Sequence, residues 1–150
     1  MLIEVQADLL STLKNKPLLC VPVNTVGVAG KGLACWMRMR YPDAYNHYRK
    51  ICRRGNMSVG DLTVVGTKDG LLAMFPTKYH WSNPADPELI RNSAERLKEY
   101  MVTNGIGSVV MSRVGCGTRT GTLDWETEVK PILLDVFRED CGLKAYVYCK

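Results

Sequence analysis

VPVNTVGVAGKGLA, residues 21–34, combines a strand signal, a glycine-rich loop and a helix start within fourteen residues. An apolar run ends at Asn24, a loop with three closely spaced glycines follows, and helical character begins at about Leu33. Glycines let backbone N–H groups approach a ligand without a Cβ in the way, and the start of the next helix favours negative charge. The pattern therefore indicates a strand, a loop suited to a phosphate and a helix. Because it matches no standard phosphate-loop spacing, a plain turn stays open as the alternative.

Length and composition predict one domain that spans residues 1–150. A chain of 150 residues, of which 46% are hydrophobic, can bury about two-thirds of its unfolded surface without disulfide support. The six cysteines form no C-x-x-C pair and only two histidines accompany them, so we expect reduced thiols, no metal site and no cofactor. The N-terminus carries no basic leader and no apolar run could span a bilayer. We therefore expect a cytoplasmic protein without a membrane partner.

Strand and helix signals alternate along the chain. A residue before proline leaves the helical region, so Tyr41-Pro42 should separate two helices. Asp86 before a proline is typical of a helix start, and Asp69-Gly70 is typical of a hairpin turn. The order predicts an α/β sandwich. The expected strands are 2–5, 17–23, 62–65, 71–75, 106–112 and 143–148, and the expected helices are a turn at 8–13 and longer segments at 33–39, 43–53, 87–103 and within 124–140.

A second glycine-bearing loop, Val114 to Thr118, follows another buried strand. In open α/β sheets ligands bind beyond the carboxyl ends of the strands, so this loop and the first could face each other across a crevice. Cys116 lies in the second loop and no partner base is evident. We therefore expect Cys116 to be a small packed side chain rather than a nucleophile.

FPTKYHW, residues 75–81, places Lys78 at the end of a buried strand, beside a proline and between aromatic residues. A lysine in such a place loses part of its hydration, which favours a neutral and nucleophilic amine. Taken alone, the residues leave a surface lysine with an aromatic packed on its stem as the more common alternative. His80 could act as a general acid or base, although a lone histidine is more often structural.

The net charge of +5 favours acidic partners such as nucleic acid or phosphate esters. Five basic residues gather in the sequence shortly after the glycine loop, which keeps a nucleic-acid surface under consideration. A solvated helix surface is the alternative and the more common one. The five residues are Arg38, Arg40, Lys50, Arg53 and Arg54.

NTVGVAGKGLA, FPTKYHW and GCGTRTGTLDW occur in this order and spacing, and together they resemble the macrodomain family. Within the family the chain is similar, over nearly its whole length, to the branch of DarG-type antitoxins and terminal ADP-ribose glycohydrolases. The resemblance implies a three-layer α/β/α macrodomain sandwich with a central mixed β-sheet and a crevice for ADP-ribose. The aspartate that terminal glycohydrolases carry soon after GCG is absent here, which favours the DarG-type pattern.

The resemblance also implies roles for individual residues. Lys78 would be catalytic, with its unprotonated amine attacking the anomeric carbon of the distal ribose and displacing the linked group. Asp8 would accept a hydrogen bond from the adenine amino group, with a backbone contact from Leu9. The remaining substrate-binding residues would hold the distal ribose and the diphosphate; they are Asn24, Thr25, Gly27, Gly30, Lys31, Gly32, Leu33, Ala34, Thr77, Gly115, Cys116, Gly117 and Thr118.

The implied function is that of an ADP-ribosylglycohydrolase, a hydrolase that removes ADP-ribose from a modified acceptor, with ADP-ribosylated DNA bases as the favoured substrate. Three alternatives stay open. The acceptor could be an aspartate or glutamate of a protein, the substrate could be ADP-ribose-1″-phosphate, or the chain could be a reader that binds ADP-ribose without turnover. We expect ADP-ribose or an ADP-ribosylated acceptor as the partner, DNA among the acceptors, and a monomer.

Overall fold

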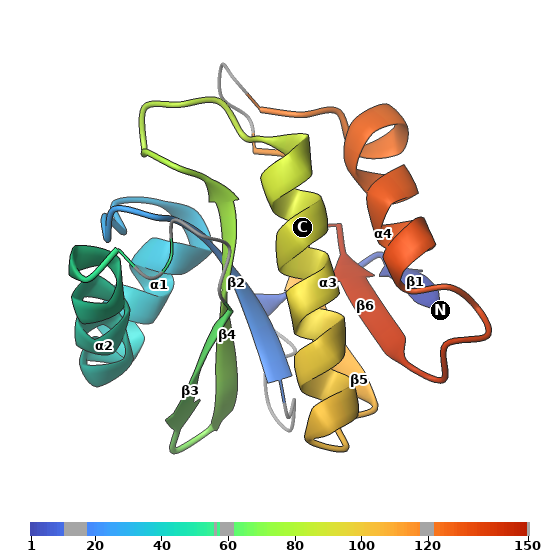
Figure 1. The fold of residues 1–150 in the computed structure, drawn as a ribbon, viewed down its shortest axis with the longest axis horizontal. Coiled ribbons are helices and arrows are strands. Elements are labelled where there is room, and N and C mark those ends of the chain that lie inside the picture. Colours follow the sequence, from blue (N-terminus) through green and yellow to red (C-terminus); the bar gives the residue numbers. More distant parts are fainter. Residues whose placement is uncertain (11–17, 56, 58–61, 118–121, 150) are drawn as a thin grey trace.

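The part of the chain that the computed structural model describes, residues 1–10, 18–55, 57, 62–117 and 122–149, contains one six-stranded sheet (Figure 1). The strands lie in the order β1-β6-β5-β2-β4-β3, and β3 with β4 is the antiparallel pair in an otherwise parallel sheet. Their bounds are β1 Leu2–Val5, β2 Leu18–Asn24, β3 Thr63–Thr67, β4 Gly70–Lys78, β5 Ser108–Ser112 and β6 Lys144–Tyr148.

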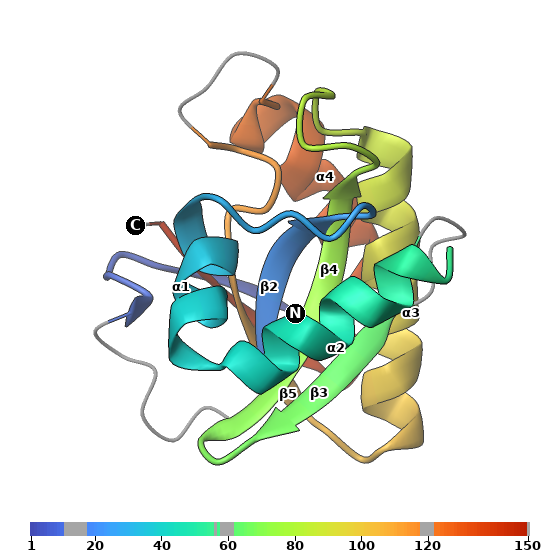
Figure 2. The same ribbon diagram turned by 90° about the vertical axis from the view of Figure 1, so that its left-hand side faces the viewer.

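Helices cover both faces of this sheet. The helices α1 and α2 lie on one face, and α3 and α4 lie on the other (Figures 1 and 2). The helical segments are α1 Gly32–Arg40, α2 Pro42–Arg53, α3 Pro87–Thr103, the π-helical turn η3 Trp125–Val129 and α4 Lys130–Val136. The predicted three-layer α/β/α sandwich with a central mixed sheet is confirmed.

The central strand β2 explains why the sheet needs two helical layers. Leu18 and Cys20 pack into the core under α3 and α4, whereas Leu19 and Val21 pack into the core under α1 and α2. All four side chains are buried. A strand that is apolar on both faces can only be covered from both sides, which is the usual situation of a parallel sheet between helices.

The predicted elements are found with small shifts of their boundaries. Tyr41 separates α1 from α2, and the Asp86 carboxylate accepts hydrogen bonds from the first turn of α3, as the proline and capping signals indicate. The last helix differs from the prediction, because η3 comes first and α4 begins only at Lys130, with a proline in its first turn. Residues 11–13 of the turn predicted at 8–13 lie outside the described residues.

Three loops leave the sheet at a single edge. The strands β2, β4 and β5 are parallel, with β2 in the middle, so their carboxyl ends lie together (Figure 1). The chain after β4 returns as α3, whose start is fixed by a hydrogen bond from the Asp86 N–H to the Thr77 carbonyl at 2.8 Å. The two glycine-bearing loops and FPTKYHW are thereby brought to the same edge, as expected from the sequence.

The carboxylate of Glu4 connects the strand β1 to the layer of α4. Its Oε1 accepts a hydrogen bond from the indole N–H of Trp125 at 2.8 Å, and its Oε2 lies 2.8 Å from Nζ of Lys130. Arg113 approaches the same carboxylate at 3.5 Å. The hydrogen bond from Lys130, and then that from Trp125, holds the pKa of Glu4 below its ordinary value.

This lowered pKa predicts a dependence of stability on pH. Glu4 contributes stability that is fully present above its unfolded pKa and lost as the pH falls through the lower folded pKa. The melting temperature of the wild type should exceed that of Glu4→Gln by a constant amount near neutrality, and the difference should shrink below about pH 4.5. Thermal denaturation across pH 3 to 7 measures it. Glu99→Gln, which removes the carboxylate of an exposed pair with Arg96, is the control, and a difference that ignores pH would contradict the assignment.

Candidate active site

The side chain of Asn24 holds the glycine loop, residues 24–32, in one shape. Its Oδ1 accepts hydrogen bonds from the N–H groups of Val26, Gly27 and Val28 at 3.1, 3.1 and 3.3 Å. Its Nδ2 donates to the Val28 carbonyl at 2.8 Å. The residue is only 7% exposed. Among the described residues, one N–H of Nδ2 is left for a ligand, so the predicted ribose contact of Asn24 stays a prediction for that single group.

Tyr48 of α2 contacts Asn24 through its hydroxyl group. The sequence did not predict this contact. The buried hydroxyl lies 2.7 Å from the Asn24 carbonyl and 3.0 Å from Oδ1. Burial raises the pKa of Tyr48, so the phenol remains a donor. Ala44, Tyr48 and Cys52 recur four residues apart on the buried face of α2. This spacing could have placed the tyrosine inside, but nothing in it identifies the polar partner.

The start of α1 is open to an anion. Lys31 occupies the N-cap position without a side-chain hydrogen bond to the helix, and the first turn holds no acidic residue. Gly30, Lys31 and Gly32 are exposed, and Gly32 takes a positive φ of 59° that favours glycine. Leu33 is half-buried and Ala34 is buried, so the first turn rests on the core, while residues 30–32 at its start are exposed. Uncapped N–H groups and the helix dipole together attract negative charge.

A bulge brings Lys78 beside this loop. Val23 pairs with Pro76, but Asn24 pairs with Lys78, so Thr77 is an extra residue in β4. Bulges often change the direction of a side chain next to a functional site. The proline is tolerated because the paired residues of β3 end opposite Met74, before Pro76 is reached.

Thr25 joins the glycine loop to the segment after Lys78. Its backbone N–H and its hydroxyl both donate to the Tyr79 carbonyl, at 3.1 and 2.6 Å. Thr25 and Thr77 are buried, and the Thr77 hydroxyl lies 3.5 Å from the Val23 carbonyl. The two loops are thus one hydrogen-bonded unit.

Lys78 itself is half-buried, and within the described ranges no hydrogen bond or ion pair reaches its Nζ. An amine without a carboxylate partner has its lone pair or its protons available to a ligand. His80 is held differently, since its Nδ1 lies 2.7 Å from the Ser82 hydroxyl and accepts the Ser82 N–H at 3.1 Å. That contact gives His80 a structural role in its turn, and its role as an acid or base stays a prediction.

The second glycine loop closes the other side of the edge. Gly115 takes a φ of 76°, and its carbonyl accepts the Leu123 N–H at 2.9 Å. The Cys116 thiol donates to the Val114 carbonyl at 3.4 Å, and burial raises the pKa of Cys116 to about 11 against the opposing effect of Arg113. A protonated, packed thiol agrees with the expectation from the sequence. Gly117 is described and exposed, whereas Thr118 lies outside the described residues.

Asp8 and Leu9 follow β1, whose carboxyl end lies at this same edge. Asp8 is exposed and its Oδ1 accepts the Leu10 N–H at 3.1 Å, while Leu9 is buried against the core of α1 and α2. The described candidate residues therefore follow the edge from β1 to β4. An elongated anionic ligand suits such an arrangement better than a compact one.

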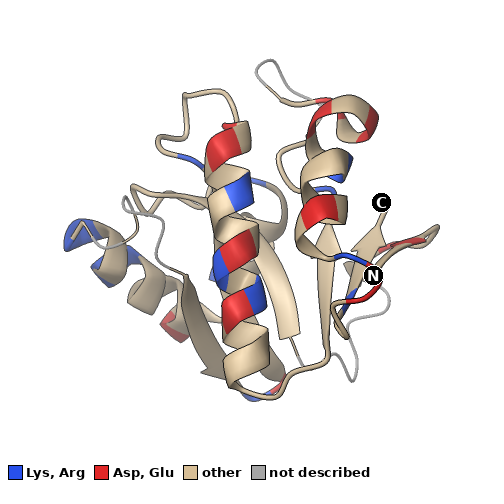
Figure 3. Ribbon diagram, turned by 45° about the vertical axis from the view of Figure 1, so that its right-hand side comes forward, with Lys and Arg blue, Asp and Glu red and all other residues tan. Residues whose placement is uncertain are grey.

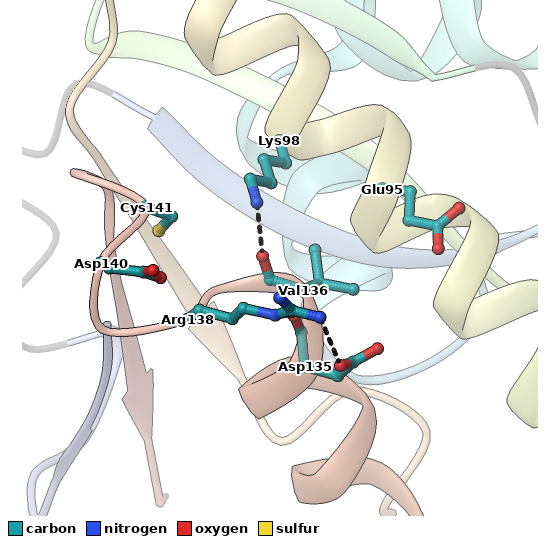
Figure 4. Close-up of a pocket in the computed structure, with 7 residues that line it drawn as sticks. All are labelled: Glu95, Lys98, Asp135, Val136, Arg138, Asp140 and Cys141. Carbon is teal, nitrogen blue, oxygen red and sulfur yellow. Dashed lines mark hydrogen bonds and ion pairs between the residues drawn. The ribbon is translucent and has the colours of Figure 1, made fainter.

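A cavity of about 380 Å³ lies elsewhere, between α3, α4 and the segment that precedes β6, and it contains none of the predicted residues (Figure 4). Its charged side chains are of both signs. Asp135 contacts Arg138 at 3.4 Å, and Lys98 donates to the Val136 carbonyl at 2.9 Å. In the described part of the chain no three metal-binding side chains gather, and no helix has the length and apolar character to cross a membrane.

Comparison with known proteins agrees with this geometry. The profile of the Macro domain family matches residues 20–130. This chain belongs to the macrodomain family. Its fold superimposes on the macrodomain of Thermus aquaticus DarG with a TM-score of 0.86 at 30% identity, covering 100% of this chain and 99% of that one. It also superimposes on Thermosipho africanus DarTG in complex with ADP-ribose with a TM-score of 0.82 at 26% identity, covering 99% of this chain and 41% of that one.

Among curated proteins, the chain is 36% identical over 130 residues to a DNA ADP-ribosyl glycohydrolase of Mycobacterium tuberculosis. The match covers 84% of this macrodomain and 36% of the relative. The chain therefore spans about a third of the length of that protein. The predicted family and the predicted DarG-type branch are confirmed.

Gly115 offers a test of the second loop. A Cβ at this position would lie 2.7 Å from Cδ1 of Ile90, in addition to the unfavourable positive φ. Gly142 has a similar φ of 77° but meets nothing within 4 Å. Gly115→Ala should therefore destabilise the protein by about 0.5–1.5 kcal/mol more than Gly142→Ala, because only at Gly115 must a neighbouring side chain, the terminal methyl of Ile90, rotate away. Equal melting temperatures of the two variants would show that the loop yields to the extra methyl group.

Proposed function

We propose that this macrodomain binds ADP-ribose along the carboxyl edge of its sheet and hydrolyses the bond that links ADP-ribose to a modified acceptor, with ADP-ribosylated DNA bases as the favoured substrate. The position of Lys78 is the observation on which the proposal depends. The bulge in β4 places it opposite Asn24, beside a loop suited to phosphate, and no described carboxylate neutralises it. A module that only bound ADP-ribose would have no need of such an amine.

The rest of the edge supplies the binding groups. The diphosphate would lie against the exposed amides at the start of α1, with Gly115 and Gly117 on its other side. Asp8 would accept a hydrogen bond from the adenine amino group. The distal ribose would then lie between the remaining Asn24 Nδ2–H and Lys78, because these two residues are paired across β2 and β4.

The reaction follows from these positions. The lone pair of Nζ of Lys78 forms a bond to the anomeric carbon of the distal ribose, while the bond from that carbon to the acceptor breaks and its electron pair leaves with the acceptor. The acceptor takes up one proton, and the lysine nitrogen loses one. Water then forms a bond to the anomeric carbon, and the bond from that carbon to Nζ breaks with its electron pair returning to the nitrogen. One proton of the water passes to the nitrogen, which restores the amine, and ADP-ribose leaves. Binding energy from the adenosine and diphosphate fixes the ribose at the amine.

Two observations favour DNA as the acceptor. The curated relative is named as a DNA ADP-ribosyl glycohydrolase, and the net charge of +5 attracts an acidic polymer. All the groups invoked come from one chain, so we also propose that the protein acts as a monomer.

Lys78→Ala tests the mechanism. The variant should bind ADP-ribose with nearly the affinity of the wild type, measured by calorimetry, and should release ADP-ribose from its substrate about 100-fold more slowly or worse, because the nucleophile is lost while the phosphate and adenine contacts remain. Lys68→Ala removes a lysine from the turn between β3 and β4, at the opposite edge of the sheet, and should leave both quantities unchanged. A Lys78→Ala variant that keeps wild-type turnover would remove the basis of the mechanism.

The acceptor is tested with three substrates in parallel: ADP-ribosylated single-stranded DNA, a protein ADP-ribosylated on acidic residues, and ADP-ribose-1″-phosphate. We expect release from the DNA alone. Turnover of only the protein or only the phosphate would replace DNA by that substrate, and binding without any turnover would make the chain a reader.

A further inference from the structure

We propose that a surface beside Lys78 binds the single-stranded nucleic acid that flanks the modified base. This aromatic–basic strip consists of Tyr79, Trp81, Arg49, Arg53 and Arg54. The inference rests on the proposed function and adds to it, since it assigns recognition of the acceptor to residues that the ADP-ribose site does not use.

Aromatic side chains form the first part of the strip. Trp81 is 59% exposed and Tyr79 is 45% exposed, although exposed aromatic surface of this size costs solvation free energy. Trp81 packs against the ring of His80 with 5.1 Å between the ring centroids. The exposed indole is three residues from the proposed nucleophile, where a base attached to the distal ribose and its neighbours would lie. Aromatic faces stack on bases of any sequence.

The loop that carries these rings, residues 79–86, is held firmly at both ends. Thr25 fixes the Tyr79 carbonyl, and the Asp86 N–H donates to the Thr77 carbonyl at 2.8 Å. Between them, the Asn83 N–H donates to the His80 carbonyl at 3.0 Å and Ser82 contacts the imidazole. Trp81 is therefore presented on an ordered turn, which reduces the entropy that a stacked base would have to offset.

Basic side chains form the second part. A Cβ placed on Gly27 would lie 3.5 Å from the Cα of Arg49, so the C-terminal end of α2 contacts the glycine loop directly. The glycine loop lies between this end of α2 and the aromatic loop (Figures 1 and 2). The three segments adjoin one another: the aromatic loop is hydrogen-bonded to the glycine loop through Thr25, and the glycine loop contacts α2 at Gly27.

The charge at this end of α2 is not neutralised. No described carboxylate lies within 4.0 Å of Arg49, Lys50, Arg53 or Arg54. Figure 3 shows basic residues gathered at the end of α2, whereas acidic and basic residues alternate along α3. Arg49 lies over the Tyr45 ring at 5.7 Å from its centroid, and its charge, like the others, has no described carboxylate partner. Cations of this kind near exposed aromatic rings fit the backbone and the bases of a single strand.

The basic residues that are grouped in the sequence do not all lie together in the structure. Arg40 lies 3.9 Å from Asp69 in the turn between β3 and β4, at the opposite edge of the sheet, so it does not belong with the arginines of α2. An acidic peptide would match the cations but would leave the exposed indole without a partner. The combination of charge and aromatic surface therefore favours nucleic acid.

The decisive comparison uses two substrates with the same ADP-ribose linkage, one in a short single-stranded oligonucleotide and one on a lone nucleoside. Trp81→Ala should raise KM for the oligonucleotide about 10-fold with little change in kcat, and should leave both constants for the nucleoside unchanged. The double variant Arg53→Ala/Arg54→Ala should do the same, and should lower the slope of log affinity against log salt by about 1 to 1.5. Arg40→Ala/Lys68→Ala, with equal charge loss at the opposite edge, should match the wild type.

Binding of an unmodified single-stranded oligonucleotide, followed by fluorescence anisotropy, separates this proposal from the proposed function. If the wild type releases ADP-ribose from neither substrate but Trp81→Ala still weakens oligonucleotide binding, the strip stands and the hydrolase does not. If the strip variants bind the oligonucleotide as the wild type does, or slow both substrates equally, the strip is not a nucleic-acid surface. An equal loss of turnover on an ADP-ribosylated acidic peptide would assign the strip to a protein acceptor.

Discussion

The parallel pairing of β2 with β4 fixes the positions of the groups in the candidate active site. Both strands are buried, so the hydrogen bonds between them are shielded from water and their ends cannot separate independently. Asn24 ends one strand and Lys78 ends the other. The extra residue in β4 sets which side chain faces the glycine loop, and Thr25 repeats the connection just beyond the sheet. The positions of Asn24 and Lys78 thus depend on apolar strand residues that would not themselves contact the ligand.

Polar groups near this edge are used in two ways. One group of side chains forms nearly all its hydrogen bonds within the protein, and these bonds determine the shape of the loops. The group consists of Asn24, Tyr48 and Thr25. Lys78 and the amides at the start of α1 have no such partners among the described residues. This division is typical of an organised site, where satisfied buried groups hold unsatisfied exposed ones in position.

Much of this arrangement could be predicted from the sequence, because the deciding signals are local. The proline after Tyr41, the capping carboxylate of Asp86 and the apolar run of β2 each act within a few residues, and the elements they predict are present. The bulge at Thr77 and the contact of Tyr48 with Asn24 could not be predicted, because both depend on how distant segments register after packing. The separation of Arg40 from the arginines of α2 has the same cause, since two helices adjacent in sequence end at opposite edges of the sheet.

The uncapped start of α1 has a consequence for how this protein would respond to selection. Serine or aspartate at a helix N-cap usually stabilises a protein by about 1 kcal/mol, and Lys31 supplies no such bond. A search for heat-resistant variants would favour those replacements. The new side-chain oxygen, however, would occupy the amides that an anionic guest requires. Thermal resistance and ligand recognition would therefore evolve in opposite directions at this residue, and a sturdier variant could be a poorer binder.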